Sequence, residues 1–212
     1  MKETKTLLAF GDSNTWGLVP GSSPARRFPR DIRWTGILQS VLSDVDVIEE
    51  GLCGRTTIFE DRLRAGRNGL SSLPFILESK SPIDAAVIML GTNDCKPIYS
   101  ASAHVIGSGL QKCLDILQEY VRAEKILVVS PLFLGDDVWL PSKDPEFSPA
   151  SVKVSRELKD VYGDISAKRG HRFLAASDFV TPSSTDDEHM DEAGHSAFAK
   201  AVIDKLRSSG II

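Results

Sequence analysis

The chain has 212 residues and a formal net charge of -4, with 25 lysines and arginines against 29 aspartates and glutamates. Because the cations are scattered among the acids and form no stripe, we expect no nucleic-acid partner. The length predicts a single domain over residues 1–212, which would bury about 70% of the surface of the unfolded chain.

The ends and the cysteines bear on the cellular compartment. Residues 1–10 carry Lys2, Glu3 and Lys5 and an apolar run that is too short for a signal peptide, and no run has the length of a membrane span. The three cysteines are an odd number without metal-ligand spacing, which favours a reducing compartment over a disulfide framework. We therefore expect a cytoplasmic protein with no membrane contact, metal or cofactor.

Short apolar runs recur along the chain with the length of buried parallel strands. They are residues 7–10, 45–48, 85–90, 126–129 and 173–175. Helical patterns lie between or after these runs, at residues 34–42, 105–121, 152–168 and 192–206. This alternation predicts βαβ units and a parallel sheet with helices on both faces.

Two irregular, proline-containing stretches interrupt the alternation, at residues 18–32 and 131–149. Loops of this length in a compact domain usually serve a function or are disordered. Because exposed aromatic side chains in such loops are costly to leave in water, we expect both loops to contribute to a homo-oligomer.

The first candidate motif is Gly11-Asp12-Ser13-Asn14, which follows the first strand. In a parallel sheet, catalytic and ligand-binding residues usually lie where the carboxyl ends of the strands meet the following loops. A tight turn there would lift the Ser13 hydroxyl above the sheet edge. The same four residues are equally typical of a turn that caps a helix.

Gly54 follows the second strand and Asn93 the third. A glycine lets its backbone N–H approach a bound acyl oxygen without interference from a Cβ, although by itself it indicates only a turn. The Asn93 amide could donate to a developing negative charge, but a strand-ending Asx turn is the simpler interpretation of this residue alone. Cys53 and Cys95 adjoin these positions, and packing of small side chains explains them better than a redox pair.

Asp186 and His189 stand three residues apart, just before the last helix. A serine hydroxyl is a poor nucleophile unless an imidazole takes its proton, and a carboxylate holds that imidazole in the correct tautomer. The spacing can point both side chains the same way. The alternative is that residues 185–188 form a solvated acidic helix cap and that His189 is a surface histidine.

Four motifs in order are much more specific than any one of them. They are Gly11-Asp12-Ser13, Gly54, Gly91-Thr92-Asn93-Asp94 and Asp186-x-x-His189. They resemble the four sequence blocks of the SGNH (GDSL-type) hydrolases, which are serine esterases and lipases of flavodoxin-like fold. The resemblance spans nearly the whole chain and implies an α/β fold, a flavodoxin-like three-layer α/β/α sandwich with a five-stranded parallel sheet.

The finer pattern is similar to the bacterial arylesterase and acyltransferase branch of this family. It comprises residues 10–17, Arg33-Trp34-Thr35-Gly36, Glu49-Glu50-Gly51-Leu52 and Arg55-Thr56-Thr57. Asn14 departs from the leucine that many members carry, which could change the polarity beside the nucleophile.

The resemblance assigns a role to each motif residue. Ser13 would be the nucleophile, His189 the general base and Asp186 its orienting carboxylate. The oxyanion hole would consist of the N–H groups of Ser13 and Gly54 and the side-chain amide of Asn93. Each donor of this kind stabilises the transition state by about 3 kcal/mol.

The resulting expectation is a serine carboxylic-ester hydrolase of the arylesterase type, acting on short-chain acyl esters through an acyl-enzyme on Ser13, with water or an alcohol as acceptor. We expect Asp12, Trp16 and Trp139 to bind the small-molecule ester. A carbohydrate O-acetyl esterase, which needs a polar and open cleft, is the main alternative; thioester hydrolysis and lysophospholipase activity rank lower. A non-catalytic flavodoxin-like domain that binds a phosphorylated ligand or flavin would leave His189 and its carboxylate unexplained.

Overall fold

A computed structural model describes residues 4–212 of the chain, so Lys2 and Glu3 lie outside it. Its centre is a sheet with strand order β2-β1-β3-β4-β5 in which every neighbouring pair is parallel. The strands are β1 (Lys5–Gly11), β2 (Val45–Gly51), β3 (Ala85–Met89), β4 (Ile126–Ser130) and β5 (Arg172–Ala175). The five-stranded parallel sheet expected from the sequence is confirmed.

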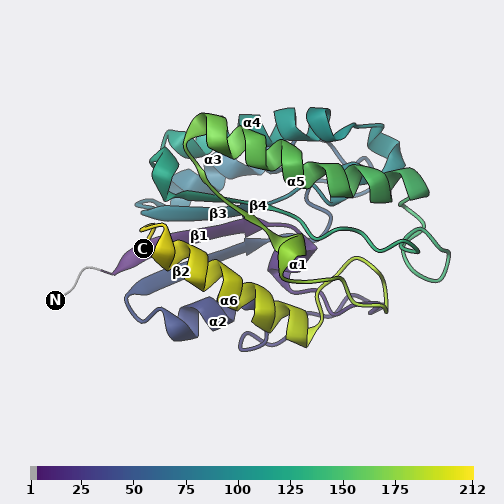
Figure 1. The fold of residues 1–212 in the computed structure, drawn as a ribbon, viewed down its shortest axis with the longest axis horizontal. Coiled ribbons are helices and arrows are strands. Elements are labelled where there is room, and N and C mark those ends of the chain that lie inside the picture. The colour runs from purple at the N-terminus through teal and green to yellow at the C-terminus, as the bar shows by residue number, and fades with distance from the viewer. Residues whose placement is uncertain (1–3) are drawn as a thin grey trace.

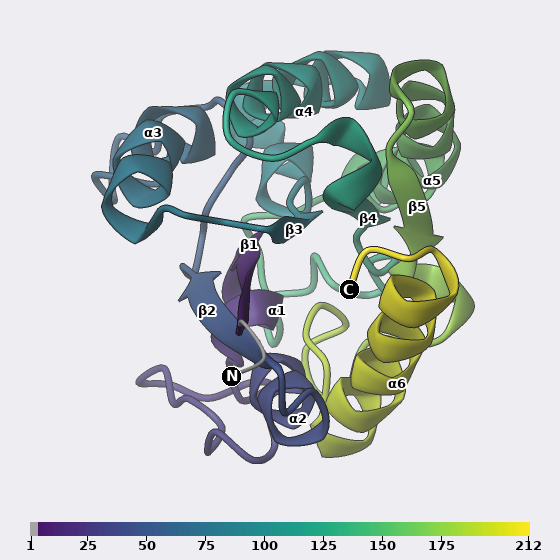
Figure 2. The same cartoon turned by 90° about the vertical axis from the view of Figure 1, so that its left-hand side faces the viewer.

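Helices cover both faces of the sheet (Figures 1 and 2). On one face lie α2 (Trp34–Val41) and α6 (Glu192–Ser208). On the other lie α3 (Gly69–Lys80), α4 (Ala103–Gln118) and α5 (Pro149–Arg169). This arrangement is the expected three-layer α/β/α sandwich, and within residues 4–212 no helix is long and apolar enough to cross a bilayer.

Strand β1 shows how the sheet supports two cores. Leu8 and Phe10 pack into the apolar cluster under α3, α4 and α5, whereas Leu7 and Ala9 pack into the cluster under α2 and α6. Successive side chains of a strand point to opposite faces, and both faces are covered here. The strand therefore appears in the sequence as a continuous apolar run.

Helix α3 has no counterpart among the helices expected from the sequence. It contains Pro74, which normally ends or kinks a helix, and two serines in its first turns. Asn68 caps it by accepting a hydrogen bond from the Ser71 N–H at 3.2 Å. Leu73 and Leu77, four residues apart, are fully buried. Burial of each side chain stabilises the folded state by about 1.5–3 kcal/mol. Tertiary burial thus overrides a weak local signal.

Helix α5 begins earlier than expected, at Pro149. Ser148 and Ser151 form a reciprocal capping box, and the proline occupies the first helical turn, where its missing N–H has no helical partner to lose. The second long loop therefore ends at Ser148. Helix α4 also begins earlier, at Ala103, because Ser102 caps it.

Candidate active site

Four loops meet at the carboxyl edge of the sheet. Ser13 begins the short helix α1 (Ser13–Trp16) directly after β1, and Asn93 begins the 3-10 turn η1 (Asn93–Cys95) after β3. Gly54 follows β2, and residues 183–190 precede α6. Because β2 and β3 are the two neighbours of β1, their loops flank Ser13.

Ser13, His189 and Asp186 form one hydrogen-bonded row. The Ser13 Oγ lies 2.9 Å from Nε2 of His189, and Nδ1 of the same ring lies 2.8 Å from Oδ2 of Asp186. All three residues are at most 6% exposed. Asp186 and His189 are therefore not part of a solvated cap, and the structure brings the expected triad residues together.

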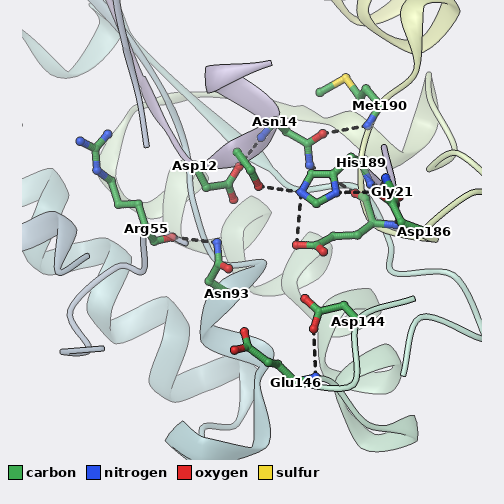
Figure 3. A network of polar contacts seen from close by, with 12 residues as sticks. Asp12, Asn14, Gly21, Arg55, Asn93, Asp144, Glu146, Asp186, His189 and Met190 are labelled. Carbon is green, nitrogen blue, oxygen red and sulfur yellow. Dashed lines mark hydrogen bonds and ion pairs between the residues drawn. The ribbon is translucent and has the colours of Figure 1, made fainter. Parts of the chain in front are cut away.

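Backbone amides hold the carboxylate of Asp186 from two directions (Figure 3). Its Oδ1 accepts from the N–H groups of Glu188 and His189, at 3.1 and 3.0 Å, and its Oδ2 accepts from Gly21, in the first long loop, at 2.9 Å. Burial alone would raise the pKa of Asp186, but these hydrogen bonds and the nearby imidazole outweigh it and lower the pKa. The carboxylate is thus ionised and fixed in direction.

Asn14 joins helix α1, which carries Ser13, to the loop that carries His189. Its Oδ1 accepts from the Met190 N–H at 2.9 Å, and its Nδ2 donates to the Glu188 carbonyl at 3.3 Å (Figure 3). The side chain is 3% exposed. The departure from leucine thus supplies two hydrogen bonds that fix Ser13 relative to His189.

A second carboxyl group, that of Glu188, lies beside the histidine. Its Oε1 is 3.5 Å from Nε2 of His189, on the side of the ring that faces Ser13. Burial raises the pKa of Glu188 to about 7. From the sequence, this residue was named only within the alternative interpretation, a solvated acidic cap, and had no role in the site; the only signal was an acid directly before the histidine.

The expected oxyanion donors occupy constrained positions. Gly54 has a φ of 81°, in the left-handed region, where any residue with a side chain is strained. In the described part of the chain, no group accepts a hydrogen bond from the Gly54 N–H. The Asn93 Nδ2 donates one hydrogen to the Arg55 carbonyl at 3.1 Å, which orients the amide and leaves its other hydrogen for a ligand.

Two buried side chains, which stand in the sequence motifs without a role assigned to them there, stabilise this edge of the sheet. Arg55 donates through Nη1 to the carbonyls of Gly11 and Glu50, and therefore ties the Gly54 loop to β1 and β2. Asp94 accepts from the Thr57 N–H at 2.9 Å and from the Thr57 hydroxyl, which joins the loops after β2 and β3.

Asp12, Trp16 and Trp139 lie outside the cavity next to His189. Asp12 caps α1, accepting from the Asn14 N–H at 3.0 Å, and burial raises its pKa to about 6. The Trp16 ring lies 5.2 Å from the Arg27 guanidinium, and the Trp139 indole donates to a backbone carbonyl while packing against the core. A contact between these residues and a substrate stays a prediction.

The cavity beside His189 has a volume of about 360 Å3. Three segments line it: Leu18 and residues 21–23 of the first long loop, residues 142–144 of the second, and Thr185, Asp186, Glu188 and His189. Apart from Leu18, its lining residues are polar, charged or glycine. Within residues 4–212, no group of three or more His, Cys, Asp or Glu side chains is placed to hold a metal ion, and the three cysteines are free thiols.

Comparisons with known proteins agree with this geometry. Residues 9–197 match the family model of the GDSL-like lipase/acylhydrolases. A search of curated proteins found no match.

Among solved structures, the aryl esterase of M. smegmatis is 33% identical, with a TM-score of 0.87 over 96% of this chain and 99% of that chain. A carbohydrate acetylesterase from Sinorhizobium meliloti is 32% identical, with the same TM-score and the same coverage. A non-catalytic flavodoxin-like domain is not supported by these similarities. The chain belongs to the GDSL-like lipase/acylhydrolase family, that is, to the SGNH hydrolases, and is a carboxylic-ester hydrolase.

Proposed function

We propose that this protein hydrolyses short-chain acyl esters, as an esterase of the arylesterase type, through an acyl-enzyme on Ser13. The observation that carries the proposal is the row Ser13 Oγ, His189 Nε2 and Asp186 Oδ2, with contacts of 2.9 and 2.8 Å. In this geometry one imidazole can take the hydroxyl proton while a carboxylate stabilises the charge that forms. The M. smegmatis aryl esterase lends support by its similarity.

The reaction divides into acylation and deacylation. Ser13 Oγ attacks the ester carbonyl as its proton passes to Nε2 of His189, and the carbonyl oxygen becomes an oxyanion. The N–H groups of Ser13 and Gly54 and the free hydrogen of the Asn93 amide would receive that charge, each stabilising it by about 3 kcal/mol. His189 then protonates the departing alkoxide, and a water molecule repeats the sequence on the acyl-enzyme.

A carbohydrate O-acetyl ester is the second candidate substrate, and the cavity favours it. Ser22, Ser142, Lys143 and Thr185 line the cavity beside the histidine, and these groups can bind the hydroxyls of a sugar. The Sinorhizobium meliloti acetylesterase is a neighbour of this kind. The acetyl group is itself a short acyl chain, so the two candidates differ in the leaving group alone.

Acyl transfer to an alcohol would compete with hydrolysis if the site excludes water and orients the acceptor. The polar lining favours a hydroxylated acceptor over a long alkyl alcohol.

We also propose a cytoplasmic location, which the free thiols of Cys53, Cys95 and Cys113 support.

Replacement of the nucleophile tests the mechanism. Ser13→Ala should fold normally and lose aryl acetate hydrolysis by about 10⁴-fold or more, because the members of a triad act as a unit. Ser166→Ala is the matched control, because Ser166 is also a buried helical serine but bonds only the Tyr162 carbonyl on α5. If Ser13→Ala keeps near-native turnover, the proposed mechanism is wrong. Comparison of acetylated sugars with aryl acetates then decides between the two substrate classes.

A further inference from the structure

The ring of His189 has a carboxyl group on each side. Asp186 accepts at Nδ1, at 2.8 Å, and Glu188 Oε1 lies 3.5 Å from Nε2. The latter distance is longer than a normal hydrogen bond, so Glu188 acts on the ring through its charge and leaves the closer position, at 2.9 Å, to the Ser13 hydroxyl. A triad of serine, histidine and aspartate contains no group with this role.

Glu188 is 5% exposed, and among the ion pairs of residues 4–212 it has His189 as its one partner. Its backbone is held in place, because its carbonyl accepts from the Asn14 amide and its N–H donates to Asp186. A buried carboxylate with a single cationic partner stabilises the protonated form of that partner. The backbone of Glu188 is therefore held by the same residues that hold His189, and its carboxyl group lies beside the ring.

A second cation, Lys96, also lowers the pKa of Glu188, but less than the imidazolium of His189 does. Lys96, from the turn after β3, pairs with Glu146 and lies 3.7 Å from Asp144. Asp144, from the second long loop, raises the pKa of Glu188 further. Cys53, from the loop after β2, is uncharged near neutral pH because burial raises its pKa to about 11.

Four ionisable groups act on His189 from the surrounding elements. Burial disfavours the imidazolium, but Glu188, Asp186 and Asp12 together outweigh it and raise the pKa of His189 to about 9, with Glu188 the largest of the three charge effects. His195, in α6, is uncharged near neutral pH because burial lowers its pKa to about 4.

We propose that Glu188 is a positioning residue that stabilises the imidazolium of His189 from the Ser13 side and thereby shifts the active range of the enzyme to alkaline pH. The inference rests on the proposed function, in which His189 must be neutral to accept the Ser13 proton. The Glu188 charge also stabilises the transition state, because the imidazolium of His189 forms during the attack of Ser13 on the ester. Glu188 is ionised above its own pKa of about 7, so it suppresses activity between that pH and the midpoint of His189 and supports activity at more alkaline pH.

This double effect predicts a crossover. Activity of the native protein should rise with pH as His189 loses its proton, with a midpoint near its pKa of about 9. Glu188→Gln keeps the size of the side chain and removes the charge, so the midpoint should fall by about one to three pH units. Between the Glu188 pKa of about 7 and the native midpoint the variant should be the more active protein, by up to about tenfold for each pH unit of the shift, and at the alkaline plateau it should be slower.

The experiment measures kcat/KM on an aryl acetate from about pH 5.5 to about pH 10, a range that brackets histidine titration. Asp144→Asn is the control for loss of a carboxylate from the same cavity: Asp144 acts on Glu188 and not directly on His189, so the midpoint should move much less than in Glu188→Gln. Glu188→Asp keeps the charge on a shorter side chain and should give an intermediate midpoint. Equal loss at every pH in both Glu188 variants would overturn the inference.

An NMR titration of the labelled histidine rings in the Ser13→Ala background separates the two proposals. The His189 resonance, assigned with His189→Gln, should titrate at lower pH when Glu188→Gln is added. If it does so while Ser13→Ala retains esterase activity, the proposed function fails and the role of Glu188 on the imidazole stands. If the His189 midpoint does not move, the inference about Glu188 is wrong whatever the activity.

Discussion

Replacement of Asn14 by alanine tests how strongly the position of the histidine loop depends on one buried amide. Asn14→Ala leaves the Met190 N–H and the Glu188 carbonyl without their partners, which lie at 2.9 and 3.3 Å. A stranded buried N–H costs about 1–3 kcal/mol, and loss of an ordinary hydrogen bond costs about 0.5–1.5 kcal/mol. The sum is about 1.5–4.5 kcal/mol of unfolding free energy, or on the order of 10 °C in Tm for a domain of this size.

The effect on catalysis should exceed what the loss of stability alone would cause. The freed segment carries His189, and a displacement of about 1 Å in a catalytic group can lower turnover about 100-fold. We expect kcat to fall and KM to change little, because the amide holds the base loop and does not line the cavity. Thermal unfolding followed by circular dichroism and steady-state kinetics on an aryl acetate measure the two effects.

Gln39→Ala is the matched control for this variant. The Gln39 amide also bridges two backbone groups, since it donates to the Val45 carbonyl at 2.8 Å and accepts from the Val47 N–H at 2.9 Å. Gln39 lies in α2, and its amide connects this helix to the start of β2, at the opposite end of that strand from the Gly54 loop. Gln39→Ala should therefore lower Tm with no change in kcat. If Asn14→Ala reduces kcat no more than Gln39→Ala does, Asn14 has no role in positioning the base.

Two further predictions concern the oxyanion hole and assembly. Gly54→Ala should lower kcat about 100-fold. An L residue is strained at a φ of 81°, and the added Cβ would lie 3.2 Å from the Arg64 guanidinium. Near-native kcat in a variant with an unchanged loop would contradict this prediction. Sedimentation at assay concentrations should show a homo-oligomer built partly by the loops of residues 18–32 and 131–148, and a monodisperse monomer would refute that expectation.

The sheet could be predicted from the sequence because each strand is buried on both faces. Runs such as Ala85–Met89 are apolar at every position. Such a run can be recognised in the sequence without knowing which strands or helices pack against it. Helix α3 could not be predicted in the same way. Its stability comes from Leu73 and Leu77 packing into the core, whereas Pro74 and the serines argue locally against a helix.

The triad residues could be assigned by resemblance, but the groups that set their properties could not. The sequence does not distinguish a solvated acid before a histidine from a buried one. The burial of Glu188 depends on loops that are distant in the sequence. For Trp16 and Trp139 the residue type predicts a contact with substrate, and this stays a prediction. The direction of such a side chain is set by tertiary neighbours, such as Arg27 for Trp16.

The two long loops brace the segment that carries Asp186 and His189. Gly21, in the first loop, donates to the Asp186 carboxylate at 2.9 Å. Gly135, in the second, donates to the Asp187 carbonyl at 2.8 Å, and a Cβ at this glycine would lie 2.4 Å from the Asp187 carboxyl carbon, so the two segments touch closely. A subunit contact on either loop would therefore act on the direction of the Asp186 carboxylate as well as on stability. Assembly and catalysis are for this reason expected to be coupled.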